Sequence, residues 1–486
     1  MPLVEPILHG GLAGHPHTDL YPAVAGMAWF TEHAGQVLPA FAPELAAPRG
    51  MPFVYSSPLH GWLAVVLRPL LGLPYTWLTG LALARIATVL CAHGAGRALG
   101  LTPAGALVLA AVYGCSPLFH GYAVEGIVEG TDGWALPLWV WLAARERWAG
   151  ATVAAALVVM SSWYMALAGL LAALAVAPWA WRATGTYVAG LLICSPAMLV
   201  FTGATALSTP LDPAVRASMG ASTELFPRPG VLPGLNPFAR TSWLGWITAA
   251  LALASIRRHP RWALAAAVAA ILSLGVGPWY ELPGWQSVRF PYRLHVLTLL
   301  AAGVLAARSV QRLAARFPAR RWIAPALAAV VVVEGMLLSP VEPLVPSSPA
   351  EVPRTYHDLR GRVVLSVPGP LTRPPGEMNP SRPRARYLLY YPAMSGTRTA
   401  WAPDFNGIGA GTEVAIHDAV RSWDPHEGRD AQAVPLGALR EAGIDALVVH
   451  RQELGSQRTR ELLEHLESQG ARTSELEEGL VVVSGW

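Results

Sequence analysis

A short polar loop near the start of the chain holds side chains that could do acid–base chemistry. His15, His17 and Asp19 lie in it, directly ahead of an apolar segment. A carboxylate at a membrane surface can accept the proton of a sugar or lipid hydroxyl, and its oxygens can also hold a divalent cation. The simpler alternative is that Asp19 caps a helix that starts at Leu20. The two histidines define no metal site without a third ligand.

Two further polar groups fall in later loops. Glu125, Glu129 and Asp132 stand in one loop between apolar stretches, and Arg289 and Arg293 flank the sequence Phe-Pro-Tyr in another. The acidic loop could shape a binding site, hold a cation or only solvate the surface. Arginine can pair phosphate oxygens through its planar guanidinium. An arginine at a membrane boundary can equally well reach toward lipid headgroups.

The elements that must position these groups are membrane helices. Of the 486 residues, 53% are hydrophobic and only 14% are charged, whereas soluble domains are about 25% charged. A chain this long and apolar is expected to cross a membrane several times. All 35 basic residues are arginine, which excludes a lysine Schiff base and a Walker-type nucleotide site. The arginines are spread singly or in pairs, so no nucleic-acid partner is expected.

The apolar stretches predict a polytopic α-helical membrane protein with about ten spans over residues 74–338. Residues 1–73 are expected to form a first outer loop, in which 21–38 is an amphipathic helix lying on the membrane and 57–72 is a short interfacial or re-entrant piece. Several predicted spans are shorter than the roughly 20 residues of a straight crossing. They are placed at residues 74–96, 104–119, 134–144, 151–165, 166–181, 187–201, 243–256, 262–276, 291–307 and 322–338.

The placement of arginine orients these spans. Arginine-rich loops alternate with loops that hold the acidic groups, and cytoplasmic loops of membrane proteins are the arginine-rich ones. The loops that contain Asp19, Asp132 and Arg289 are therefore expected on the outer side. The loops expected in the cytoplasm are marked by Arg97, Arg145, Arg182, Arg257 and Arg308.

The composition changes near residue 340, where prolines cluster and a polar segment of mixed charge begins. Val363–Val367 and Ala446–His450 have the pattern of buried strands, 458–469 that of an amphipathic helix, and 479–484 that of a final strand. Residues 339–486 are thus predicted to form an extracytoplasmic α/β domain.

Several short motifs follow one another along nearly the whole chain. They are His17-Thr-Asp19, Gly50-Met-Pro52 with Tyr55, Ala92-His-Gly-Ala-Gly-Arg97, Trp134-Ala-Leu-Pro-Leu138, Trp243-Leu-Gly-Trp246, Arg289-Phe-Pro-Tyr-Arg293 and Gly443-Ile-Asp-Ala-Leu-Val-Val-His450. In this order they resemble the GT-C superfamily of polyprenyl-phosphate-sugar-dependent membrane glycosyltransferases, and more closely its bacterial YfhO-like type.

The resemblance implies a glycosyltransferase of the bacterial inner (cytoplasmic) membrane. It would move a sugar from a polyprenyl-phosphate donor to an extracytoplasmic lipid, glycan or protein, so its partners would be the membrane lipid and that donor. Asp19 would be the catalytic base. The substrate-binding residues would be His17, Glu125, Glu129 and Asp132, with Arg289 and Arg293 on the donor phosphate. Dependence on a divalent cation stays open, because the first loop has one aspartate and no Asp-x-Asp pair.

Two other functions remain open. The chain could be a non-catalytic envelope protein that kept the fold, or a lipid or glycan transporter, whose polar residues would line a path at mid-membrane. The resemblance also implies a membrane helix ahead of the first outer loop. A start site placed too late or a truncated gene is one explanation for a missing first helix, and it favours the non-catalytic alternative.

Overall fold

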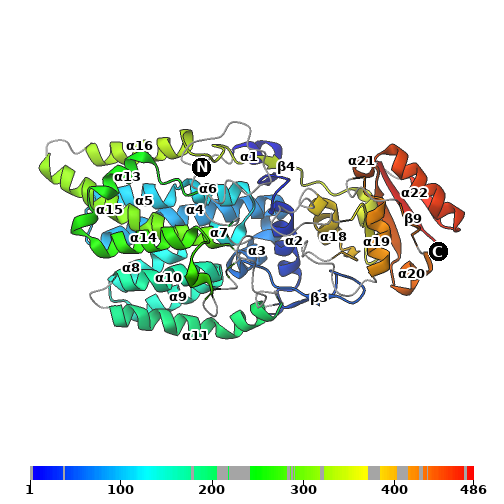
Figure 1. Ribbon diagram of the computed structural model, residues 1–486, viewed down its shortest axis with the longest axis horizontal. Coiled ribbons are helices and arrows are strands. Elements are labelled where there is room, and N and C mark those ends of the chain that lie inside the picture. The colour runs from blue at the N-terminus through cyan, green and yellow to red at the C-terminus, as the bar shows by residue number, and fades with distance from the viewer. Residues whose placement is uncertain are drawn as a thin grey trace. The chain divides into compact units, whose positions relative to one another are not determined.

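The computed structural model describes residues 4–36, 39–176, 180–204, 217, 241–281, 285, 288, 290–317, 322–369, 384–401, 414–425, 431–434, 436–475 and 479–486. The chain divides into two compact units. The helical unit comprises Met1–His15 and Tyr55–Ser348, and the sheet unit comprises Pro16–Val54 and Pro349–Trp486. Figure 1 labels their helices and strands.

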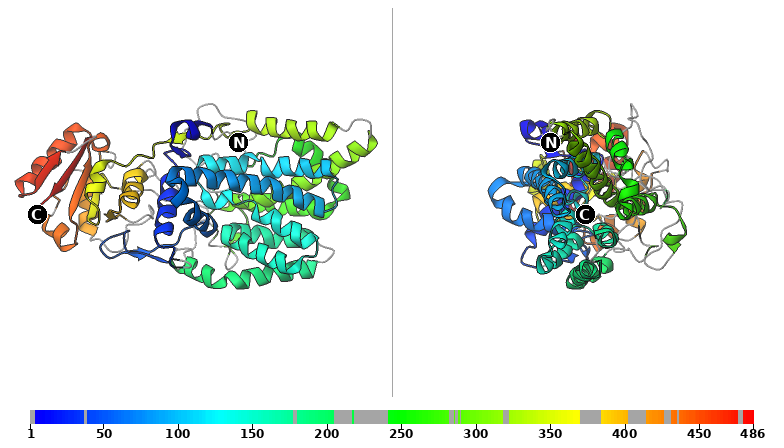
Figure 2. Two further views of the ribbon diagram at one scale, coloured as in Figure 1. Left: turned by 180° about the vertical axis from the view of Figure 1, so that it is seen from behind. Right: turned by 90° about the vertical axis from the view of Figure 1, so that its left-hand side faces the viewer.

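Three segments of the described helical unit are long and apolar enough to cross a membrane. Figure 2 shows the helices of this unit lengthwise in one view and end-on in the other, so they run alongside one another. The three segments are α4 (Leu73–Ala98), α5 (Pro103–Gly114) together with α6 (Pro117–Val124), and η4 (Pro291–Leu294) together with α15 (His295–Arg316).

Other helices complete the described part of the unit. They are α1 (Val4–His9), α3 (Pro58–Leu71), α7 (Val128–Thr131), α8 (Ala135–Ala144), α9 (Trp148–Ser161), α10 (Trp163–Val176), α11 (Ala180–Ala204), α13 (Trp246–Leu253), η2 (Ile256–Arg258), α14 (Pro260–Ser273), η3 (Pro278–Glu281) and α16 (Ile323–Leu337). Two short strands, β1 (Leu12–Ala13) and β4 (Ser347–Ser348), pair antiparallel.

Local sequence explains where these helices start and how closely they pack. The hydroxyls of Thr102 and Ser116 cap α5 and α6, each of which begins with a proline, a combination favoured at helix N-termini. Helix α4 packs against α5 and α8, and α15 against α5, α13 and α14. A β-carbon at Gly114 would lie 2.8 Å from the Cα of Val89, so the contact between α4 and α5 requires a glycine there.

The helices agree with the predicted spans in position more than in length. Each predicted span overlaps a helix of the structure. Only three segments of the described chain qualify as candidate spans, however, so the count of about ten remains a prediction. The predicted span 104–119 is broken at Cys115 and Ser116 into α5 and α6.

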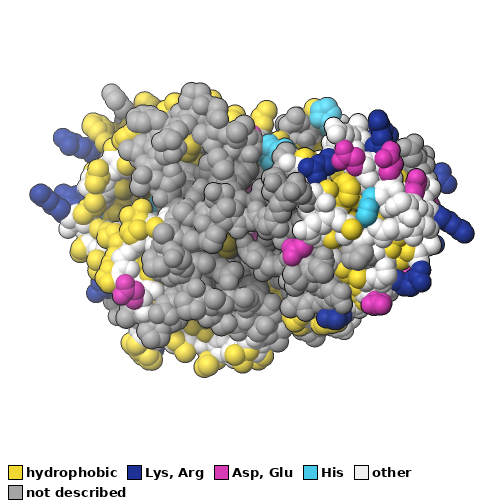
Figure 3. All heavy atoms as spheres, turned by 45° about the vertical axis from the view of Figure 1, so that its right-hand side comes forward, with side chains coloured by type: hydrophobic (Ala, Val, Ile, Leu, Met, Phe, Trp, Pro, Cys, Tyr) yellow, Lys and Arg dark blue, Asp and Glu magenta, His cyan; other side chains and the backbone are white. Residues whose placement is uncertain are grey.

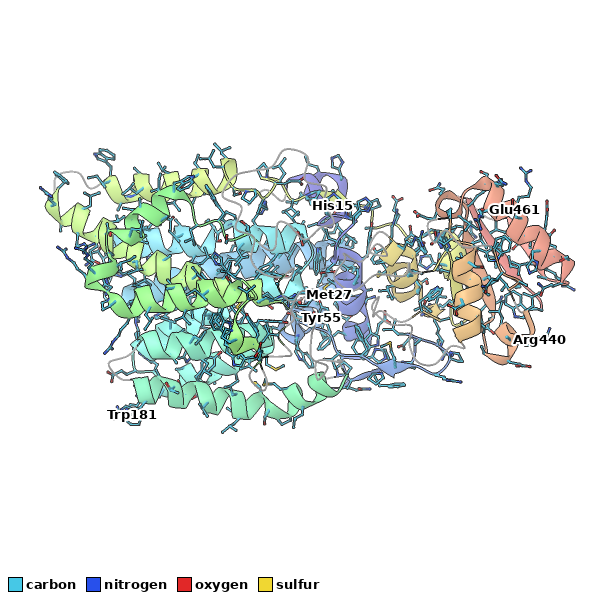
Figure 4. The ribbon with its side chains drawn as sticks, in the orientation of Figure 1. His15, Met27, Tyr55, Trp181, Arg440 and Glu461 are labelled. Carbon is cyan, nitrogen blue, oxygen red and sulfur yellow. The ribbon has the colours of Figure 1, made fainter. Side chains whose placement is uncertain are left out.

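Arginines of the loops predicted to be cytoplasmic contact neighbouring loops of the same predicted set. Arg308 donates from Nη2 to the carbonyl of Leu99 at 2.5 Å, beyond the end of α4. Arg312 donates to the carbonyl of Ala254 at 3.0 Å, at the end of α13. Cations at a helix C-terminus satisfy carbonyls that have no partner within the helix. The arginine-rich loops marked by Arg97, Arg257 and Arg308 therefore lie at one end of the helical unit, and Figure 4 labels Trp181, which precedes Arg182, at the same end.

The sheet unit contains a five-stranded mixed sheet. β5 (Val363–Val367) lies parallel to β6 (Arg398–Thr399) and β7 (Ala446–His450), and β9 (Leu480–Ser484) lies antiparallel to β7 and β8 (Arg472–Glu475). Every residue of β5 and β7 is buried, as expected for continuous apolar runs in the centre of a sheet. In spatial order the strands are β6, β5, β7, β9 and β8.

The strands predicted at Val363–Val367 and Ala446–His450 are confirmed at their predicted bounds. The predicted helix and final strand appear as α22 (Ser456–Ser468) and β9, each shifted by one or two residues at its start. The remaining helices of the unit are α17 (Arg354–Asp358), η6 (Arg386–Tyr390), α18 (Tyr391–Ser395), α19 (Val414–Ser422), α20 (Leu436–Glu441) and α21 (Arg451–Leu454).

The N-terminal part of the sheet unit holds α2 (Leu20–Glu32) and the strand pair β2 (Phe41–Ala42) and β3 (Met51–Pro52). The prediction of an amphipathic membrane-surface helix over 21–38 is wrong. Helix α2 ends at Glu32, is buried over most of its length and packs against η6 and α18. Consecutive residues from Val24 to Phe30 are all buried, so this helix presents no polar face to water.

The two units also differ in the side chains that they expose. On the face drawn in Figure 3, the described surface of the helical unit is mainly hydrophobic, with basic side chains at its left-hand end. The sheet unit shows acidic and basic side chains intermingled. A largely apolar outer surface is expected where helices face lipid.

Candidate functional site

A buried ion pair forms the centre of a polar cluster in the helical unit. Nη2 of Arg293, in η4, lies 2.7 Å from Oε1 of Glu129, in α7, and the two side chains are only 8% and 18% exposed. The other carboxylate oxygen of Glu129 accepts a hydrogen bond of 3.2 Å from the hydroxyl of Ser56. The structure thus brings together two of the residues that the sequence analysis singled out, Glu129 and Arg293.

Asp132 lies in the same loop as Glu129 and is almost fully buried. It accepts hydrogen bonds from the hydroxyl of Ser57 at 2.8 Å and from the indole N–H of Trp134 at 3.2 Å. Burial raises the pKa of Asp132 from 3.8 to about 6, although the two hydrogen bonds oppose this rise. A carboxyl group with such a pKa can exchange a proton near neutral pH.

Aromatic rings surround the guanidinium group of Arg293. Its Cζ lies 4.7 Å from the ring centre of Phe290, 5.0 Å from that of Tyr164 and 5.8 Å from that of Tyr292. Its Nε also donates to the hydroxyl of Tyr292 at 3.4 Å. Cation–π contacts of this kind are strongest where water is excluded. Arg293 is therefore held in one position inside the protein and does not extend toward lipid headgroups.

Two further side chains belong to the cluster by position. Glu125 is fully buried where α6 ends, so it does not serve to solvate a surface loop. Tyr55, which Figure 4 labels, directly precedes the two serines and is also buried. Burial and the nearby Glu129 and Asp132 hold the pKa of the Tyr55 hydroxyl well above its usual value.

The N-terminal loop is divided between the two units. His15 belongs to the helical unit, where its backbone N–H donates to the carbonyl of Val124 at 2.7 Å. His17 and Asp19 belong to the sheet unit. Asp19 occupies the cap position of α2, but its side chain makes no capping hydrogen bond, so the cap alternative holds for the backbone position only.

One predicted site residue is not described by the structure, and dependence on a divalent cation is an open alternative. Arg289 lies outside the described residues. Within the described chain, no three histidine, cysteine, aspartate or glutamate side chains converge in a way that could hold a metal ion. The cluster around Glu129 therefore does not fit a metal centre built from these residues.

Sequence reasoning missed Ser56, Ser57 and Tyr164, and it named Trp134 only as part of a short motif. Ser57 precedes Pro58, the first residue of α3, and so has the local pattern of a helix cap. Its hydroxyl bonds Asp132 instead. The contact crosses 75 positions of sequence, and no local pattern predicts a partner so distant.

The architecture places the chain in a structural class. It has a GT-C-like fold, as a comparison with solved structures shows. The structure is similar to a cryo-EM structure of arabinofuranosyltransferase AftD from Mycobacteria, with a TM-score of 0.51 and 18% sequence identity. The match covers 98% of this chain and 40% of the AftD chain.

At this identity the likeness concerns the fold alone, and this chain spans less than half the length of AftD. The likeness does not support the YfhO-like type expected from the short motifs. No protein-family model matches the chain, and no curated protein matches it.

Proposed function

We propose that this protein is a membrane glycosyltransferase of the GT-C kind that takes its sugar from a polyprenyl-phosphate donor. The observation that carries the proposal is the buried Glu129–Arg293 pair beside Asp132, within a GT-C-like helical unit. A buried charge cluster is costly to maintain without a function. The acceptor would be a lipid, glycan or protein outside the cytoplasmic membrane.

The reaction breaks the bond between the sugar C1 and a phosphate oxygen and forms a bond from C1 to the acceptor oxygen. The acceptor hydroxyl must lose its proton, and the departing phosphate gains negative charge. Arg293 would bind that phosphate, because its guanidinium is already oriented by Glu129 and the three aromatic rings. Glu125, Glu129 and Asp132 would shape the site, and Asp19 would be the base that takes the proton, with His17 beside it.

One observation favours a non-catalytic protein. The charge of Arg293 is already balanced by Glu129, as it would be if the pair served only to join η4 to α7. In that case neither residue would need a substrate. The two functions differ in whether the protein binds a polyprenyl-phosphate sugar at all.

The experiment is sugar transfer from a radiolabelled polyprenyl-phosphate sugar by the full chain in reconstituted vesicles, with direct binding of the same lipid measured beside it. Asp19→Asn should keep binding and lower turnover about 10²- to 10⁴-fold, the usual contribution of a general base. Arg293→Gln should weaken binding. Full activity of Asp19→Asn would remove that residue from the mechanism, and a wild-type protein that binds no such lipid would favour the non-catalytic alternative.

The proposed orientation puts the arginine-rich loops in the cytoplasm and the C-terminal residues outside. Single cysteines placed at Arg147 and Ser339 should then react with an impermeant reagent from opposite sides of the membrane. Labelling from one side only would contradict this topology.

A further inference from the structure

A tight turn at the arginine-rich end of the helical unit displays positive charge. It joins α8 to α9 through Arg145, Glu146 and Arg147, and the N–H groups of Glu146 and Arg147 bond the carbonyls of Ala143 and Leu142 at 3.0 and 2.9 Å. Glu146 has φ of +57°, a conformation that non-glycine residues rarely adopt. The three charged side chains of the turn are exposed.

Tryptophan rings hold two arginines beside this turn. The Cζ of Arg182, at the start of α11, lies 4.8 Å from the ring centre of Trp181 and 6.0 Å from that of Trp148. Arg145 lies 5.8 Å from the ring of Trp141. A guanidinium whose flat face rests on a ring keeps its edge N–H groups directed outward, toward an acceptor. Arg145, Arg147 and Arg182 against Glu146 leave this surface with two net positive charges.

An apolar stripe runs down α11 from this surface. Val188, Leu192 and Leu199 are exposed, and so is Trp181, at 72%. Their spacing places all four on one face of the helix. From Trp181 to Leu199 the helix extends about 27 Å at a rise of about 1.5 Å per residue. That length is close to the roughly 30 Å of a bilayer's hydrocarbon core.

We propose that the α8–α9 turn and the first turn of α11 bind the phosphate of an anionic phospholipid, whose acyl chains lie along the α11 stripe. Arginine edges pair the phosphodiester oxygens, and Trp181 lies at the level of the lipid glycerol, where tryptophan is enriched. A peptide or nucleic acid would match the charge but not the apolar stripe that continues from it. The proposal rests on the membrane character of the helical unit and does not depend on glycosyl transfer.

The test uses the full chain in detergent, titrated with dioleoylphosphatidylglycerol and followed by native mass spectrometry. The site variant is Arg145→Gln with Arg147→Gln and Arg182→Gln. The matched control is Arg257→Gln with Arg258→Gln and Arg261→Gln, which removes equal charge from arginines that are exposed elsewhere in the helical unit. The dissociation constant of the tightest-bound phosphatidylglycerol should rise tenfold or more in the site variant, because each arginine near an anionic lipid contributes about fivefold to the affinity. It should stay within about twofold of wild type in the control, a range that covers general charge screening.

Equal weakening in both triple variants, or phosphatidylcholine binding as tightly as phosphatidylglycerol, would overturn the proposal. If the site triple variant does not fold, Arg147→Gln and Trp181→Ala replace it, since both side chains point outward from the bundle surface. Each should weaken phosphatidylglycerol binding several-fold, and Trp181→Phe should recover part of the loss. Unchanged binding in both single variants would also overturn it.

Discussion

Ser57 donates its hydroxyl hydrogen to Asp132 across 2.8 Å, at the point where the chain re-enters the helical unit. This bond stabilises the ionised carboxylate, while burial works against it. The balance between the two leaves Asp132 as a group that titrates within an experimentally accessible pH range.

The first prediction concerns the pH dependence of stability. The pKa of Asp132 rises from 3.8 to about 6 in the folded protein, so the folded state holds the proton more tightly than the unfolded state between these values. The contribution of protonated Asp132 to the stability of the folded state is fully present below pH 3.8 and is lost as the pH rises through 6. An asparagine at this position does not titrate. The free energy of unfolding of Asp132→Asn, relative to that of wild type, should therefore rise by up to about 3 kcal/mol between pH 4 and 8, at about 1.36 kcal/mol per pKa unit.

Denaturation of both proteins in detergent across this pH range measures the difference. In a Ser57→Ala background the difference in stability between Asp132 and Asp132→Asn should be larger, because loss of the hydroxyl raises the pKa of Asp132 further. Stability curves of wild type and Asp132→Asn that run parallel from pH 4 to 8 would show that Asp132 has an ordinary pKa.

The second prediction concerns the Glu129–Arg293 pair. Removing one partner leaves a buried charge without its counter-ion, which typically costs about 3–5 kcal/mol. Glu129→Gln and Arg293→Gln should each destabilise the protein, and the double variant should lose much less than the sum of the two. Melting temperatures of the four proteins in one detergent give this coupling energy, and simple additivity would mean that the two side chains do not interact in solution.

The third prediction concerns Glu334, a buried acid within the apolar helix α16. Its Oε1 accepts a hydrogen bond of 2.6 Å from the N–H of Trp246, and both carboxylate oxygens lie within 3.4 Å of the N–H of Ile247. The side chain therefore caps α13 across the bundle. Glu334→Leu leaves these N–H groups without their acceptor and should cost about 1–3 kcal/mol.

Gly245 supplies an independent check of the same contact. It has φ of +84°, and a β-carbon there would lie 2.7 Å from Oε2 of Glu334. Gly245→Ala should therefore lower the melting temperature of the wild-type protein but add little to Glu334→Leu beyond the backbone strain. A Glu334→Leu variant as stable as wild type would rule out the cap.

The fourth prediction concerns what the sheet unit needs in order to fold. The N–H of Ala47 bonds the carbonyl of Thr399 at 2.9 Å, and the N–H of Thr399 bonds the carbonyl of Glu44 at 2.8 Å. Residues 44–47 thus cover the exposed edge of β6, and unpaired edges promote aggregation. Residues 349–486 expressed alone should be unfolded or aggregated.

The matching control protein joins residues 16–54 to 349–486 through a flexible Gly/Ser linker and should fold, as judged by circular dichroism and amide dispersion in NMR. A folded fragment 349–486, with dispersion equal to that of the linked form, would show that the N-terminal segment is dispensable. Tyr21→Phe, which removes the hydrogen bond to the carbonyl of Pro349, should weaken the linked form by about 1 kcal/mol.

Local sequence patterns account for what could be predicted, and long-range contacts account for what could not. The strands at Val363–Val367 and Ala446–His450 were predictable because short, mainly apolar runs rich in valine and bounded by polar residues favour central strands. The helix positions were predictable from apolar runs and from capped prolines such as Thr102-Pro103. Each of these signals lies within a few residues of the element that it predicts.

The site was only partly predictable for the same reason. Glu129 and Arg293 are charged residues in apolar surroundings, which marks both as candidates. Their partners Ser56 and Tyr164 carry no such mark, because a serine in a loop and a tyrosine in an apolar helix are ordinary. The packing of residues 16–54 with residues 349–486 could not be predicted. Nothing local in the sequence of α2 distinguishes a helix buried against other helices from one buried in lipid.

The division of the chain has a consequence for biosynthesis. Residues 16–54 leave the ribosome early, yet the strands and helices that they pack against begin at Pro349. All of residues 55–348 must be translated, and their helices inserted, while the apolar surface of α2 has no partner. The nascent protein therefore carries an apolar segment without its packing partners while residues 55–348 are translated. A chaperone that shields residues 20–32 should raise the yield of correctly assembled protein.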